Sequence, residues 1–136
     1  MADLVITAAN VIFVSGNKLT AIAEQAITAG QSVYAVAGSS GIRLAQADGT
    51  VAESECVGIA LHGCLTAQPI TYAANGAVLL IGATTAKTTT YMVSAAAGGI
   101  APQADLVSTN KITRIGYATD TGGLFTVDIK STGAVV

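Results

Sequence analysis

The amino-acid sequence predicts a single all-β domain, a compact barrel or sandwich with at most one short helix. A chain of 136 residues fits one domain. Many of its short segments are rich in β-branched and aromatic residues, and most are bounded by Gly, Asn, Ser or Thr. Two segments with some helical character, 19–30 and 95–106, are interrupted by Gly, Pro or β-branched residues, so we expect no more than short turns there.

The expected strands are 4–7, 11–14, 32–36, 56–61, 69–73, 77–81, 90–93, 111–118 and 124–129. In the segment 111–118 polar and apolar residues alternate, which is typical of a strand with one buried face. Asn75 and Gly76 give the strongest hairpin signal, because both residues tolerate a positive φ angle. The stretch 121–123 marks another turn.

An internal repeat relates the two halves of the chain. The stretch "GIRLAQAD" (41–48) returns as "GGIAPQAD" (98–105), Tyr34 matches Tyr91 at the same offset, and Gly58 matches Gly116 after a shift of one residue. The ordered matches predict two related β-modules, 24–78 and 81–135, within one domain of residues 24–136. The shared Gln-Ala-Asp is then the same turn in both modules. The alternative is a pair of Asp residues that hold a cation or a sugar.

Residues 1–23 lie outside both copies, and we interpret them as an N-terminal strand or arm. An apolar strand left in water invites aggregation, so the arm must be covered. We predict that its first part, roughly residues 1–14, contacts a partner chain; the alternative is that this part folds back onto its own domain. The candidate partner-binding residues are Leu4, Val5, Ile6, Val11, Ile12 and Phe13.

Charge and hydropathy narrow the function classes. Only 10% of the residues are charged, the net charge is −2 and the cations are dispersed, which argues against direct binding of nucleic acid. Apolar runs such as 77–81 are far shorter than the roughly 20 residues of a membrane-spanning helix. The start "MADLVITAAN" does not resemble a secretory signal, so we expect synthesis in the cytoplasm. A chain so poor in charge is expected to have part of its surface covered by other protein.

The sequence contains no recognisable catalytic constellation. His62 is the single histidine, and the residue pattern supplies no third group to orient it toward Cys64. Cys56 and Cys64 are expected to be free thiols in a protein made in the cytoplasm. We therefore expect no enzyme activity, no cofactor and no metal site.

The segments "AITAGQSVYAV", "ECVGIAL" and "ITYAANGAV", followed by "TTYMVSAAAGGIAPQADL", "ITRIGYA" and "FTVDI", resemble the head-decoration, or capsid cement, proteins of tailed bacteriophages. The resemblance covers the chain from about residue 26 to residue 136. It implies a compact, β-tulip-like fold and homotrimers that sit on the outside of the virion. It also implies that the major capsid protein is the partner and that binding reinforces the shell. The alternative is a virion or cell-surface β-domain that binds carbohydrate or a receptor.

Overall fold

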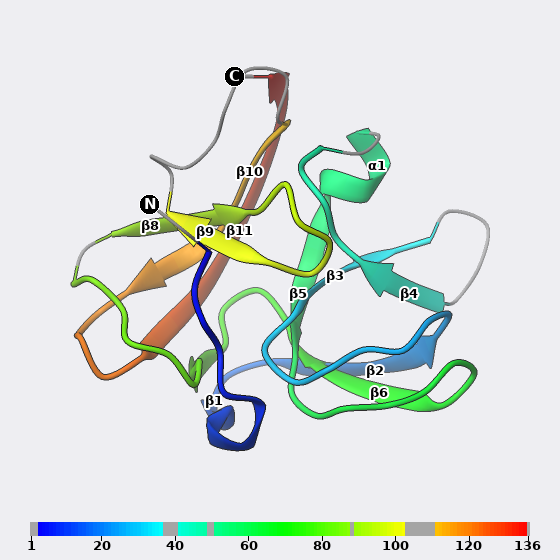
Figure 1. The fold of residues 1–136 in the computed structure, drawn as a ribbon, viewed down its shortest axis with the longest axis horizontal. Coiled ribbons are helices and arrows are strands. Elements are labelled where there is room, and N and C mark those ends of the chain that lie inside the picture. Colours follow the sequence, from blue (N-terminus) through cyan, green and yellow to red (C-terminus); the bar gives the residue numbers. More distant parts are fainter. Residues whose placement is uncertain (1–2, 37–40, 49–50, 88, 103–110, 136) are drawn as a thin grey trace.

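The computed structural model describes residues 3–36, 41–48, 51–87, 89–102 and 111–135, and it is all-β, as the sequence predicts (Figure 1). Its helical elements within these residues are short: the 3-10 helix η1 (Ala8–Asn10) and the single turn α1 (Val51–Ser54). The strands are β1 (Ile12–Ser15), β2 (Lys18–Ala23), β3 (Ser32–Ala35), β4 (Gly41–Leu44), β5 (Cys56–Ala60), β6 (Pro69–Ala73), β7 (Val78–Leu80), β8 (Thr90–Val93), β9 (Ile100–Pro102), β10 (Lys111–Ala118) and β11 (Leu124–Val135).

The described strands form two units. One is a closed barrel with the order β2-β4-β3-β5-β6, and the other is an open six-stranded sheet with the order β1-β7-β11-β10-β8-β9. Figure 1 shows the barrel on the right and the open sheet on the left. Each unit has its own core, and the larger core runs from the open sheet into the base of the barrel. At its centre the rings of Tyr91 and Phe125 lie 5.8 Å apart and tilted.

The two units share strand order and register. The run β2-β6-β5-β3-β4 in the barrel corresponds to β7-β11-β10-β8-β9 in the open sheet. Val33 in β3 pairs with Gly58 in β5, and Tyr91 in β8 pairs with Gly116 in β10. In both ladders the register shifts directly after this pair. Gly58 therefore corresponds to Gly116, and Val33 corresponds to Tyr91. The predicted match of Tyr34 with Tyr91 is therefore shifted by one residue from the correspondence in the structure.

The N-terminal part differs from the expected strands. Residues 4–7, expected to be a strand, run in extended form without joining a sheet ladder. Residues 18–23, which the prediction placed in the arm, form β2 of the barrel. The strands β2, β4 and β9 were not predicted from the sequence, and the expectation of only short turns in 19–30 and 95–106 is wrong where β2 and β9 form. The strands β4 and β9 are short and contain or follow Gly, and all three are held by pairing with other strands.

The turn at Asn75 and Gly76 forms, with a φ angle of +92° at Gly76, but it does not close a hairpin. The strand before it, β6, already pairs with β2 on one edge and with β5 on the other. No edge is left for β7, which pairs with β1 and β11 instead. The expected hairpin is thus wrong, and this turn carries the chain from the barrel to the open sheet. The turn at 121–123, in contrast, does join the paired strands β10 and β11.

Candidate partner-binding surface

The N-terminal segment 3–7 lies across one end of the open sheet. The Leu4 amide donates to the carbonyl oxygen of Ile100 in β9 at 2.8 Å, and the Thr7 amide donates to the carbonyl oxygen of Gly82, just after β7, at 2.8 Å. The Ser94 hydroxyl donates to the carboxylate of Asp3, whose oxygens lie 2.7 and 2.8 Å away. The segment therefore connects β9 with the loop that follows β7.

The six residues predicted to bind a partner divide into two groups. The extended backbone turns alternate side chains to opposite faces. Leu4, Ile6, Val11 and Phe13 pack against the chain's own core. Val5 and Ile12 face outward and are 86% and 54% exposed. The outward face also includes Val14, the last residue of the segment predicted to contact a partner, which is 52% exposed.

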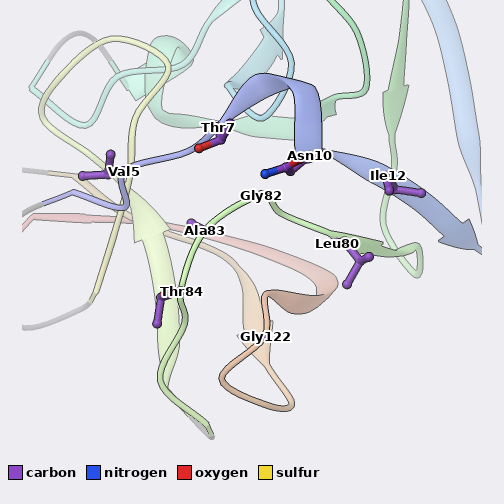
Figure 2. A pocket seen from close by; sticks show the side chains of 9 residues that line it. All are labelled: Val5, Thr7, Asn10, Ile12, Leu80, Gly82, Ala83, Thr84 and Gly122. Carbon is purple, nitrogen blue, oxygen red and sulfur yellow. The ribbon is translucent and has the colours of Figure 1, made fainter.

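The exposed residues Val5, Ile12 and Val14 are called the outer strip below. Val5 and Ile12 line a groove of about 530 Å³ and lie toward its two ends (Figure 2). The groove lies between the N-terminal segment and the loop that follows β7, and none of the described residues that line it is charged. Its lining residues are Val5, Thr7, Asn10, Ile12, Leu80, Gly82, Ala83, Thr84 and Gly122.

The strand β1 is an edge of the open sheet. It pairs with β7 through Ile12 and Leu80, and its ladder shifts between Phe13 and Ser15. The ammonium group of Lys18 lies 4.9 Å from the centre of the Phe13 ring, which is close enough for a cation–π contact. A bulge and a nearby lysine are features by which proteins limit uncontrolled edge pairing. Along the rest of the strand, aliphatic side chains remain open to a partner.

The residues considered for catalysis are engaged in structural contacts. The His62 Nε2 atom accepts from the Thr71 amide at 3.0 Å, and Nδ1 lies 3.0 Å from the Gly63 carbonyl oxygen. With Nε2 as the acceptor, the proton sits on Nδ1 and is donated to that carbonyl. The ring thereby holds the loop between β5 and β6 in place. Within the described ranges, no three His, Cys, Asp or Glu residues gather as a metal site.

Cys56 and Cys64 are both free thiols. Burial raises the pKa of Cys56 to about 12, and its thiol donates a hydrogen bond to the Gly58 carbonyl oxygen at 3.2 Å. A thiol with so high a pKa is a poor nucleophile, because the thiolate is the reactive form. Cys56 therefore serves as a small apolar residue of the core.

Aromatic side chains are mostly turned inward. Tyr72, Tyr91 and Phe125 are buried, and Tyr117 on β10 is 38% exposed. Carbohydrate sites commonly place exposed aromatic faces against the sugar, and none of these buried rings is available for that contact. The described residues thus lack a cluster of exposed aromatic rings.

The first Gln-Ala-Asp stretch joins the two units of the fold. The Gln46 side-chain amide donates to the Ala95 carbonyl oxygen at 2.9 Å, and the Ala47 amide donates to the Ser94 carbonyl oxygen at 2.8 Å. Asp48 follows in an exposed turn. The second stretch, 103–105, lies outside the described residues, so the equivalence of the two turns stays a prediction.

No protein-family model matches the chain, and no curated protein is significantly similar to it. Among the described residues, no helix has the length and apolar character needed to cross a lipid bilayer.

Proposed function

We propose that this chain is a non-catalytic structural protein of a phage virion that binds the outside of the assembled capsid and stabilises the shell. In this proposal the major capsid protein is the partner and the chain acts as a homotrimer. The support is the pattern resemblance to head-decoration proteins, joined with the all-β fold and the outer strip. The exposed aliphatic strip beside an uncharged groove is the observation that carries the proposal.

The outer strip has the chemistry of a protein-binding surface. Three aliphatic side chains, Val5, Ile12 and Val14, are more than half exposed on one segment and its adjoining edge strand. Burying a large aliphatic side chain contributes about 1.5–3 kcal/mol, so the three together could supply several kcal/mol per contact. None of the described residues that line the groove beside them is charged, so a partner would not have to desolvate an ion there.

Many weak contacts are sufficient for a cementing role. A protein that binds only the assembled lattice stabilises that lattice by mass action. If three strips are joined in a trimer, the second and third contacts become intramolecular, which raises the avidity without any new kind of contact. A small apolar strip on each chain is therefore enough for tight binding to a repeating shell.

The test is co-sedimentation with empty shells assembled from the major capsid protein of the same phage. We expect saturable binding to shells, no binding to unassembled subunits, and a higher melting temperature for decorated shells. Ile12→Asp should weaken binding at least tenfold. The matched control is Leu65→Asp, which adds the same charge at a 66% exposed residue in the barrel loop between β5 and β6 and should change binding less than twofold.

Two results would contradict the proposal. If the wild-type chain does not bind shells at micromolar concentration, the decoration role is wrong. If it binds shells but Ile12→Asp binds equally well, the outer strip is not the contact surface.

A further inference from the structure

The two corresponding units of the fold are closed in different ways. In the barrel, β2 pairs directly with β4 in parallel, through Ile22 and Gly41 and through Ala23 and Ile42. The Ile42 carbonyl oxygen then accepts from the amide of Glu24, the next residue after β2, at 2.9 Å. The corresponding strands of the open sheet, β7 and β9, do not pair with each other in the described structure.

In the open sheet β1 occupies the edge of β7 that faces away from β11, and the N-terminal segment bonds to β9 and to the loop that follows β7. Ile100 corresponds to Ile42 in the alignment that pairs Gly58 with Gly116, and its carbonyl oxygen accepts from Leu4 instead of from the end of β7. On the other side Thr7 bonds to Gly82, just after β7. Figure 1 shows the blue N-terminal trace running down beside β9 toward the turn before β1. The segment 3–7 thus fills a cleft that the fold leaves between β7 and β9.

The cleft is shaped for this segment. A Cβ atom on Gly30 would lie 2.5 Å from the Ile6 Cγ2 atom, and a Cβ atom on Gly82 would lie 2.6 Å from the Thr7 carbonyl oxygen. Both glycines also have positive φ angles, +89° and +76°, which other residues rarely adopt. Asp3 adds a polar anchor on Ser94. Main-chain bonds, apolar side chains and close glycine contacts together define a receptor for one extended peptide.

The connection between the segment and the sheet is the short helix η1. The helix η1 contains no buried residue and has no side-chain cap. It is held by two main-chain bonds, from the Asn10 amide to the Thr7 carbonyl oxygen at 2.9 Å and from the Val11 amide to the Ala8 carbonyl oxygen at 3.2 Å. Opening this turn frees the segment, and every contact that the segment makes in its own cleft is available in the same cleft of another copy.

We propose that the cleft between β7 and β9 is a donor-strand site, and that the segment 3–7 of a second copy of this chain occupies it in exchange for the chain's own segment. Exchange of an identical element links copies at low energetic cost, because the segment makes the same interactions in either copy. The recognition mode is the binding of an extended peptide by main-chain bonds with alternate side chains in pockets. This inference does not depend on a capsid partner.

The first test uses a chain that lacks residues 2–7 and a fluorescent peptide with the sequence of residues 1–7. We expect saturable binding of one peptide per truncated chain. We also expect the truncated chain to melt at a higher temperature with the peptide than without it. A peptide with Ile6→Asp should bind at least tenfold more weakly, because the carboxylate would enter the apolar core. The full-length chain should also bind the peptide at least tenfold more weakly, because its own segment fills the site.

The second test measures exchange between chains. The truncated chain serves as a tagged receptor, and a full-length chain with Gly82→Ala, shown to be folded by circular dichroism, serves as the donor, because the added Cβ would lie 2.6 Å from the Thr7 carbonyl oxygen and weaken the hold of the segment in its own cleft. We expect the tagged receptor to retain at least ten times as much donor as untagged truncated chain. The truncated chain has no segment to donate, so its retention measures association through any other surface.

Every outcome decides the proposal. A truncated chain that folds but does not bind the peptide contradicts it, and so does a truncated chain that unfolds and is not rescued by the peptide. Peptide binding with equal retention of donor and truncated chains would confirm the cleft but overturn exchange between copies. A failure of capsid binding would leave both tests unaffected.

Discussion

Gly58 and Gly116 occupy the same position in the two units of this protein, each beneath an aromatic ring of the neighbouring strand. A Cβ atom on Gly58 would lie 2.6 Å from the ring of Tyr72, and one on Gly116 would lie 2.8 Å from the ring of Phe125. Each Cβ would also overlap a carbonyl oxygen of that strand. The close contact of strand and ring is therefore the same in the barrel and in the open sheet.

Substituting either glycine should destabilise the fold. We expect Gly58→Ala and Gly116→Ala each to lower the free energy of unfolding by about 1–3 kcal/mol, because the added methyl group must displace a strand carbonyl and a packed ring. Equilibrium unfolding in urea measures the change. The matched control is Gly122→Ala, where the nearest atom, Asp120 Oδ1, lies 3.6 Å from the Cβ position and the expected change is within about 0.5 kcal/mol. A neutral Gly116→Ala variant would contradict the packing described here.

The two cysteines should differ in reactivity in the folded protein. The pKa of about 12 leaves roughly one Cys56 thiol in ten thousand ionised at pH 8, so a disulfide reagent should not modify it. Cys64 is partly exposed and should react faster. In denaturant without reductant, titration should find two thiols per chain. Rapid modification of Cys56 in the native protein would show that its site is open to solvent.

The same burial predicts a loss of stability at alkaline pH. The pKa of Cys56 is raised from 9.0 in the ordinary thiol to about 12 in the fold. The buried neutral thiol therefore makes its full contribution to the free energy of unfolding below pH 9. Between pH 9 and pH 12 the unfolded chain loses this proton while the folded chain keeps it. The free energy of unfolding should then fall by up to about 1.4 kcal/mol per pH unit. Cys56→Ala should reduce this slope, and an unchanged slope would exclude Cys56 as its source.

Adjacent residues of the N-terminal segment should behave differently. Ile6 packs against the core, and we expect Ile6→Ala to lower the free energy of unfolding by about 1–3 kcal/mol. Val5 is 86% exposed, and Val5→Ala should change the free energy of unfolding by less than about 0.5 kcal/mol. Urea unfolding of both variants tests the alternation directly. Equal effects would mean that the segment does not hold the orientation seen in this structure.

The proposed trimer has a simple measurement. One chain has a mass of 13.4 kDa, and size-exclusion chromatography with light scattering should give three times that mass. The low charge and the resemblance to decoration proteins motivate this expectation. A mass of one chain at micromolar concentration would contradict a trimer in free solution.

The sequence by itself determined the class of the fold and much of its local structure. Short β-branched segments between turn residues predicted β3, β5, β6, β8, β10 and β11, because local propensity and pattern are enough to specify an extended backbone. The repeat in sequence pointed to Gly58 and Gly116, whose equivalent contacts the register displays. In the N-terminal segment, the apolar residues were recognised from composition alone.

Tertiary structure decided which edges pair and which apolar residues stay exposed. The turn at Gly76 joins two units rather than one hairpin because β6 has no free edge, and that depends on strands far away in the sequence. The segment 3–7 turns Leu4 and Ile6 inward and leaves Val5 outward because its amides bond to carbonyl oxygens far away in the sequence, at Ile100 in β9 and at Gly82 after β7. Register and closure depend on long-range contacts, and local propensity does not encode them.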